Sequence, residues 1–117
     1  MLLADTSVWV DHFRRGNATL VALLDDGQVA THPFVIGEFA CGQLHARRKI
    51  LGLMAGLPAS AEVTHAEALV FAETHHLYGR GLGWIDIHLL ASAAISNMAL
   101  WTLDRRLAAA HPHIAHR

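Results

Sequence analysis

The sequence predicts a single α/β domain built around a parallel sheet. Short apolar segments alternate along the chain with longer helical patterns, and this alternation is typical of parallel strands joined by helices. A chain of 117 residues is the size of one domain. Its residues are 53% hydrophobic and only 16% charged, which supplies an ordinary core and excludes a disordered chain.

The first strand and the first two helices follow from an apolar run and two capping residues. Leu2–Ala4 is apolar and precedes a polar cluster, so it is expected to be a short buried strand. Ser7 is expected to cap a helix over residues 8–14. Asn17 takes the same place before a helix over residues 18–26.

The middle of the chain continues the alternation. Residues 29–31 are an expected strand, and Pro33 suits the first turn of the helix that follows. Thr64 and Glu67 have the spacing of a capping box, which starts a helix ending near Tyr78. The other expected elements here are the helix from Pro33 to about Ala46, its continuation over 47–57, weakened by Gly52 and Gly56, and a brief strand at 62–63.

The last third is predicted to hold the most buried elements. A glycine-rich loop over 79–83 precedes a helix over 85–97, which is apolar nearly all round and therefore buried. Residues 99–103 are expected to form a central strand with Asp104 at its end. A short helix and a last strand around Ile114 are expected to complete the fold.

A cytoplasmic protein without a membrane segment is expected. The apolar opening is too short for the core of a signal peptide and lacks a basic segment before it. Residues 87–103 carry no Asp, Glu, Lys or Arg, but they fall short of the ~20 apolar residues that span a bilayer. Cys41 is the only cysteine, which excludes an internal disulfide and a cysteine-rich zinc site.

Four acids stand in apolar surroundings. Asp5 and Asp104 each follow an expected buried strand, and Asp86 lies in the first turn of the buried helix. Glu38 is the only charged residue within residues 33–46. Functional sites of parallel sheets lie outside the carboxyl ends of the strands. If the first and last of these strands are neighbours, the two carboxylates that follow them emerge at the same edge.

Each acid alone has a simpler interpretation, as a helix cap, a first-turn residue favoured by the helix dipole, or a residue facing water. Together they lack basic partners, since no Lys or Arg lies near Glu38 or between Asp86 and Asp104. Crowded carboxylates repel, and therefore take up protons or bind a cation. Mg²⁺ prefers oxygen ligands, Mn²⁺ accepts similar ones, and water on such an ion can attack phosphorus. The pattern favours metal-dependent hydrolysis of a phosphodiester.

The segments ADTSVW, GEFACG, WIDIHLLASA and LWTLD, in this order, resemble the PIN domain. The opening and the length look especially like VapC, the ribonuclease toxin of bacterial VapBC toxin–antitoxin pairs. The resemblance implies a single PIN domain over 1–117, with a three-layer α/β/α fold and a short central parallel sheet. It also implies a Mg²⁺-dependent endoribonuclease, often acting on a single-stranded loop of transfer RNA, and a homodimer bound by a VapB-type antitoxin.

The resemblance also assigns roles to residues. Asp5 and Asp86 are implied as the main Mg²⁺ ligands, with Mn²⁺ as a substitute. Many relatives carry a further acid just after the position of Asp104, where this chain has Arg105 and Arg106, so the number of ions stays open. The other implied roles are completion of the acidic pocket by Glu38 and Asp104 and support by hydrogen bonds from Thr6 and Thr102.

An anionic substrate agrees with the charge distribution. Removing the four pocket acids would change the formal net charge from −1 to +3. Trp9 and Trp84 flank two of these acids and could stack on an unpaired base, although a core role is commoner for tryptophan. Candidate phosphate contacts, which could equally be solvated helix ends, are Arg14, Arg15, Arg47, Arg48, Lys49, Arg105 and Arg106.

Other classes of protein were weighed against this interpretation. Ten histidines raise the possibility of zinc at His111, His113 and His116, but no HExxH spacing occurs, and most are interpreted as surface or cap residues. A phosphoacceptor receiver domain needs a strand-end lysine, whereas the only lysine, Lys49, lies in a basic helical run. An inactive PIN-like module that only binds its partner stays open.

Overall fold

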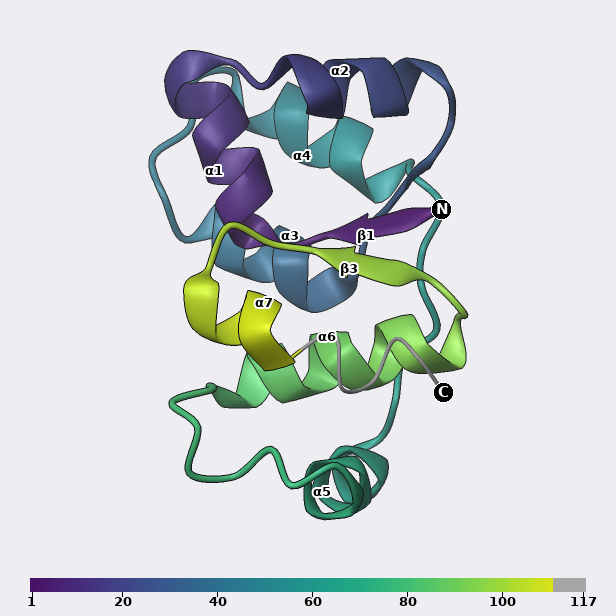
Figure 1. Cartoon of the computed structure of the whole chain (residues 1–117). Coiled ribbons are helices and arrows are strands. Elements are labelled where there is room, and N and C mark those ends of the chain that lie inside the picture. Colours follow the sequence, from purple (N-terminus) through teal and green to yellow (C-terminus); the bar gives the residue numbers. More distant parts are fainter. Residues whose placement is uncertain (111–117) are drawn as a thin grey trace.

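Three short parallel strands form the sheet of the computed structural model, which describes residues 1–110 (Figure 1). Their spatial order places β1 between β2 and β3. The carboxyl ends of all three therefore point to one edge. The bounds of the strands are Leu2–Ala4 for β1, Val29–Ala30 for β2 and Ala99–Trp101 for β3.

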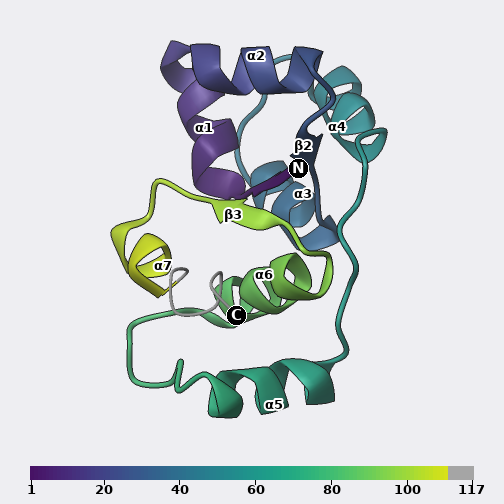
Figure 2. The ribbon, with the colours of Figure 1, turned by 45° about the vertical axis from the view of Figure 1, so that its right-hand side comes forward.

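Helices cover both faces of the sheet. They are α1 (Thr6–Arg15), α2 (Ala18–Asp25), α3 (Pro33–Ala40), α4 (Arg47–Ala55), α5 (His65–Thr74), α6 (Trp84–Ile95) and α7 (Arg105–Ala110). Figures 1 and 2 show α1, α2 and α4 on one side of the sheet and α5 and α6 on the other. The predicted three-layer α/β/α fold is confirmed. Within the described residues, no helix has the length and apolar character needed to cross a membrane.

The strand at 99–101 does not take the central position that was expected of it. β1 pairs with both other strands, and within residues 1–110 β3 pairs with β1 alone. β3 also ends two residues earlier than expected, because the N–H of Leu103 turns to donate to the Ser7 hydroxyl at 2.9 Å. The expected strand around Ile114 lies outside the described residues.

Asp5, and not Ser7, caps the first helix. The Asp5 carboxylate accepts a hydrogen bond from the N–H of Ser7 at 2.9 Å, so α1 already includes Thr6. A carboxylate two residues before a free helical N–H is as good a cap as a serine hydroxyl, and the sequence did not separate the two. Asn17 caps α2 as expected, accepting from the N–H of Leu20 at 3.0 Å.

The helix expected from Pro33 to Ala46 is broken after eight residues. α3 ends at Ala40, and Ala46 has a left-handed φ of 51° just before α4 begins. The guanidinium of Arg47 donates to the carbonyls of Ala40 and Gly42, at 2.5 and 3.2 Å. These bonds satisfy acceptors that a continuing helix would have used.

Two smaller expectations in the middle of the chain were wrong. Residues 62–63 form no strand. The segment instead pairs with the chain after β2 at an earlier position, through an isolated parallel bridge between Thr31 and Ala59. α5 begins at the expected capping box, in which Thr64 Oγ1 accepts from the N–H of Glu67 at 3.1 Å. It ends at Thr74 and not near Tyr78, since the chain turns through a left-handed φ of 53° at His76.

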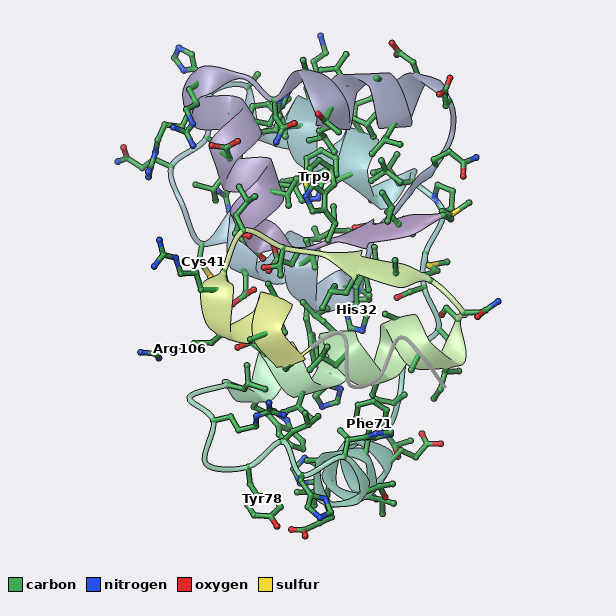
Figure 3. All side chains as sticks on the ribbon, viewed as in Figure 1. Trp9, His32, Cys41, Phe71, Tyr78 and Arg106 are labelled. Carbon is green, nitrogen blue, oxygen red and sulfur yellow. The ribbon has the colours of Figure 1, made fainter. Side chains whose placement is uncertain are left out.

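The core lies between β1 and the helices of both layers. Leu3 and Leu89 are fully or almost fully buried, and α6 is buried continuously from Ile87 to Ala93, as its apolar character predicted. Trp9 is 4% exposed and packs in this core, so the commoner core role holds for it and the alternative of stacking on a base does not (Figure 3). Trp84 is 38% exposed and keeps that possibility open.

His32 is a buried cap that holds the start of α3 (Figure 3). Its Nδ1 accepts from the N–H of Phe34 at 2.9 Å, which places the ring hydrogen on Nε2. Nε2 finds no hydrogen-bond partner within the described residues. Burial lowers the pKa of His32; the Glu62 carboxylate opposes this, and His88 lowers the pKa further.

This histidine makes the stability of the fold sensitive to mild acid. A group whose pKa is lower in the folded chain stabilises the fold fully above its unfolded pKa, here about 6.5, and loses that contribution as the pH falls towards the folded pKa. We expect the free energy of unfolding in urea to fall between pH 7 and pH 5. His32→Asn keeps a capping side chain without titrating, so its pH slope is expected to be shallower. Equal slopes in the two proteins would contradict this assignment.

Candidate active site

Asp5 is held in one orientation at the carboxyl edge of the sheet. Its side chain is 6% exposed. Oδ1 accepts from the N–H and the hydroxyl of Ser7, at 2.9 and 2.5 Å, and Oδ2 accepts from the Thr102 hydroxyl at 2.5 Å. Thr102 directly follows β3, so the pairing of β1 with β3 brings these two side chains together. Hydrogen bonds to both oxygens fix the orientation of the carboxylate.

Ser7 belongs to this site, although sequence reasoning assigned it only a capping role. Its hydroxyl donates to Asp5 and accepts from the N–H of Leu103 at 2.9 Å. Ser7 and Thr102 each donate their single hydroxyl hydrogen to Asp5. Neither can then donate to the other, so the 3.3 Å between their hydroxyl oxygens is a packing contact and not a hydrogen bond. The Asp-x-Ser spacing was the available signal, because an Asp side chain commonly binds the backbone two residues on.

Asp104 is linked to Asp5 through Thr102. The N–H of Asp104 donates to the Thr102 hydroxyl oxygen at 3.0 Å, and that hydroxyl donates to Asp5. Asp104 Oδ1 accepts from the N–H groups of Arg106 and Leu107, at 2.9 and 3.2 Å, and so caps α7. The capping interpretation is correct for this oxygen, and Oδ2 makes no hydrogen bond within the described residues.

Asp86 shares the electrostatic surroundings of these two acids. Its Oδ2 accepts from the N–H of Gly83 at 2.9 Å, which fixes the carboxylate at the start of α6. Burial raises the pKa of Asp86, the Gly83 hydrogen bond lowers it, and the negative charges of Asp104 and Asp5 raise it further. The net shift is upward, mainly through burial, and the contributions of Asp104 and Asp5 place Asp86 within electrostatic reach of both.

Glu38 reaches the same edge from α3. Its Oε1 accepts from the Thr6 hydroxyl at 2.7 Å, and Thr6 directly follows Asp5 in the chain. This bond depends on the packing of α1 against α3. The four acids and the two threonines are therefore brought to one region, where Thr6 orients Glu38 and Thr102 joins Asp5 to Asp104.

The donor set suits a hard divalent cation that keeps much of its water. Across residues 1–110, no three Asp, Glu, His or Cys side chains are gathered as a complete metal site. Mg²⁺ does not need one, since it usually binds one or two carboxylates and several waters. In the same part of the chain the only ion pair joins Arg15 and Asp11, so no basic side chain within residues 1–110 pairs with any of the four acids. His111, His113 and His116 lie outside the described residues.

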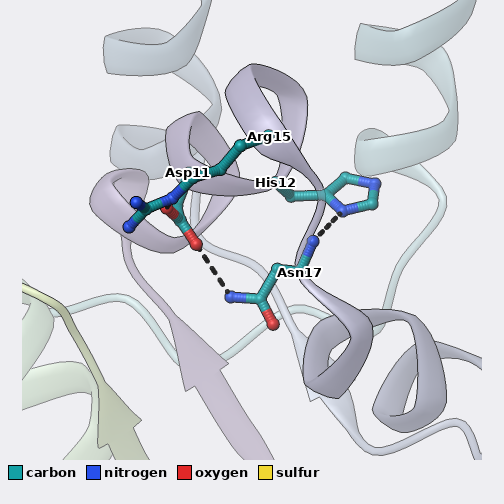
Figure 4. Close-up of polar contacts among 4 residues, drawn as sticks. All are labelled: Asp11, His12, Arg15 and Asn17. Carbon is teal, nitrogen blue, oxygen red and sulfur yellow. Dashed lines mark hydrogen bonds and ion pairs between the residues drawn. The ribbon is translucent and has the colours of Figure 1, made fainter.

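The basic residues predicted to contact phosphate differ in whether the protein itself already binds their side chains. Arg15 donates to Asp11 at 2.6 Å, and Asp11 also accepts from the Asn17 amide, so Arg15 is part of the corner between α1 and α2 (Figure 4). Arg47 is occupied by the carbonyls at the end of α3. Arg106 extends outward at the edge of the molecule (Figure 3). The remaining candidates, all exposed, are Arg14, Arg48, Lys49 and Arg105.

Comparison with known proteins decides the family. Residues 2–111 match the model of the PIN domain. The chain belongs to the PIN-domain family. Ribonuclease VapC32 of Mycobacterium tuberculosis, in strains CDC 1551 / Oshkosh and ATCC 25618 / H37Rv, is 47% identical over 111 residues, which cover 94% of this chain and 90% of the relative. The expected VapC-type PIN ribonuclease is confirmed, and the receiver-domain alternative is excluded.

A solved structure shows the same fold. The crystal structure of PAE2754 from Pyrobaculum aerophilum superposes on this PIN domain with a TM-score of 0.68, covering 96% of this chain and 80% of the other. The two sequences are 20% identical, so this likeness bears on the fold alone. It agrees with the family match on a short parallel sheet between layers of helices.

Proposed function

We propose that this PIN-domain chain is the endoribonuclease toxin of a type II toxin–antitoxin pair. In this proposal it hydrolyses RNA phosphodiester bonds with Mg²⁺, for which Mn²⁺ can substitute, and transfer RNA is the substrate class to test first. Asp5 and Asp86 hold the ion, while Glu38 and Asp104 complete the pocket. The observation that carries the proposal is geometric: Thr102 joins Asp5 to Asp104 at the carboxyl edge of the sheet, Thr6 holds Glu38 there, and Asp86 lies within electrostatic reach of Asp5 and Asp104.

In three of the four acids, one carboxylate oxygen is hydrogen-bonded to the protein and the other is not. Glu38, Asp86 and Asp104 each use one oxygen to fix the side chain, through Thr6, Gly83 and the start of α7 respectively. Their other oxygens, Oε2, Oδ1 and Oδ2, make no hydrogen bond within the described residues. These oxygens are therefore available to hold the ion or its water.

Each residue then has a defined part in the reaction. When bound, the ion supplies an acidified water as nucleophile and stabilises charge on the phosphate oxygens. Ser7 and Thr102 hold Asp5 in one orientation, in which it would bind the ion, and Thr6 holds Glu38 in place. The free carboxylate oxygens of Glu38 and Asp104 would serve as general bases for the attacking water.

An RNA cleavage assay tests the proposal. The purified chain is incubated with transfer RNA in Mg²⁺, and the new ends are sequenced. We expect cleavage at a small number of unpaired positions, its loss in EDTA, and its recovery when Mg²⁺ or Mn²⁺ is restored. Cleavage that persists in EDTA would contradict the metal-dependent mechanism. No cleavage of transfer RNA or of ribosomal RNA by the folded protein would favour the inactive binding module.

The proposed partner is a VapB-type antitoxin. An apolar hollow of about 150 Å³ between α1, α2 and α4 includes Phe13 and Leu53, which are 45% and 62% exposed. Such a hollow suits the apolar face of a partner segment. We propose that the antitoxin docks here and places a basic or amide side chain near the four acids. A homodimer, supported by further exposed apolar side chains such as Val70, is part of the same proposal.

A further inference from the structure

A second hollow, of about 370 Å³, lies directly beside the acidic pocket. A space of this size lies within the range that small ligands occupy. Its lining is mixed, with one acid, one basic side chain, one amide and several apolar groups. The lining residues are Val10, Phe13 and Arg14 of α1, Glu38 and Phe39 of α3, and Gly42, Gln43 and Leu44 of the loop between α3 and α4.

The hollow leads away from the reaction site along α1. Thr6, Val10 and Arg14 are spaced four residues apart, so they lie on one face of the helix. Thr6 binds Glu38, which itself lines the hollow, and Arg14 lies about 12 Å further along the axis. A strand of RNA cut at the acids can therefore extend one nucleotide into this space.

One wall offers an aromatic surface. The ring of Phe13 lies 5.4 Å from that of Phe39, which is 4% exposed and fixed in the core. Phe13 itself is 45% exposed, so a flat group can lie against it. Arg14, at the outer end, has no ion pair within the described residues and is free to bind an anion.

The opposite wall offers a polar side chain on a braced loop. The Gln43 amide makes no hydrogen bond within the described residues, so its donors and its acceptor are all available. Arg47 ties this loop to the end of α3 through the carbonyls of Ala40 and Gly42. Arg47 thus acts in building the hollow, and this use explains why its guanidinium is not free for phosphate.

We propose that this hollow is a nucleobase subsite that sets which RNA sequence is cut. An unpaired base next to the scissile bond stacks on Phe13, its edge bonds the Gln43 amide, and its phosphate lies on Arg14. Unpaired bases are recognised in this way, by aromatic stacking together with hydrogen bonds to their edges. This inference rests on the proposed ribonuclease function.

The test measures base preference separately from cleavage. RNA hairpins with randomised loops are cleaved by the wild type, Gln43→Ala, Gln43→Glu and Gln28→Ala, and the bases flanking each cut are counted by sequencing. Gln28, the other glutamine of the chain, is exposed at the opposite edge of the sheet and serves as the matched control. Asp5→Asn, treated in the same way, reports on the ribonuclease function itself.

The expected result is a preference at one flanking nucleotide that falls about tenfold in Gln43→Ala, as loss of an amide–base contact implies. In Gln43→Glu the preferred base is expected to change, because an amide donor is lost, while Gln28→Ala keeps the wild-type preference. Equal preferences in all four proteins overturn the subsite. Equal loss of cleavage at every sequence in Gln43→Ala also overturns the subsite. If folded Gln43→Ala keeps the wild-type preference but binds the antitoxin more weakly, the subsite is overturned as well, and the hollow is assigned to the protein partner. Undiminished cleavage by Asp5→Asn refutes the proposed function instead.

Discussion

Replacing Asp5 by asparagine is expected to slow RNA cleavage by at least about 100-fold without unfolding the protein. Changes to groups that merely orient a metal ligand lower activity by about 10- to 100-fold, and the proposed ligand itself should exceed that range. Asparagine is as good a helix cap as aspartate, so α1 should keep its start. The measurement is the single-turnover cleavage rate in Mg²⁺, with the melting temperature recorded alongside.

Asp11→Asn is the matched control for this change. Asp11 lies on the same helix, and its carboxylate pairs with Arg15, away from the pocket. Its loss should leave the cleavage rate within about twofold, since a partly exposed pair, here with Arg15 75% and Asp11 17% exposed, contributes on the order of 1 kcal/mol to stability. A folded Asp5→Asn protein that cleaves RNA as fast as Asp11→Asn would remove Asp5 from the mechanism.

Replacing Asp86 by asparagine is expected to abolish cleavage to a similar extent and to stabilise the metal-free protein. A carboxyl whose pKa is raised by folding stabilises the fold only below its unfolded pKa, here 3.8, and loses that contribution as the pH rises through the folded pKa. Burial first, and then the negative charges of Asp104 and Asp5, make the charged form of the Asp86 side chain unfavourable in the folded protein. Asparagine removes this charge, and its amide oxygen can still accept from the N–H of Gly83.

The expected gain is about 0.5 kcal/mol, the scale of a partly exposed charge pair, or roughly 2–4 °C in Tm. Thermal unfolding in EDTA at pH 7 measures it, with Asp25→Asn on the exposed side of α2 as the control. The gain should shrink as the pH is lowered and the wild-type carboxyl protonates. A metal-free Asp86→Asn protein that melts below the wild type would show that the carboxylate is not under repulsion.

The acidic edge could be predicted because it follows from strand order alone. Asp5 and Asp104 directly follow or nearly follow apolar strands, and parallel pairing of those strands brings them to one edge. Glu38 is different: its apolar surroundings marked it as unusual, but its place depends on how α1 packs against α3, and the family resemblance assigned it to the pocket. The same applies to Asp86, whose coupling to the other acids requires α6 to cover the sheet.

The errors arose where tertiary contacts override local patterns. α3 ends at Ala40 through a tightened turn, in which the N–H groups of Cys41 and Gly42 donate to the carbonyls of Glu38 and Phe39, and Arg47 then binds the Ala40 carbonyl. Trp9 stands between Val8 and Val10 and is buried, as the commoner role of tryptophan indicated, so its nearness in sequence to Asp5 carried no information about RNA contact. Gln43 had no sequence signal at all, because its importance comes from the hollow that three separate segments form.

The central claim is that these carboxylates together bind a divalent cation on which cleavage depends. The most direct measurement is titration of the metal-free protein with Mn²⁺, followed by electron paramagnetic resonance of the free ion. We expect saturable binding by the wild type and by Asp25→Asn, weakened at least about tenfold in Asp5→Asn and in Asp86→Asn. Equal Mn²⁺ affinity in all four proteins would contradict the claim.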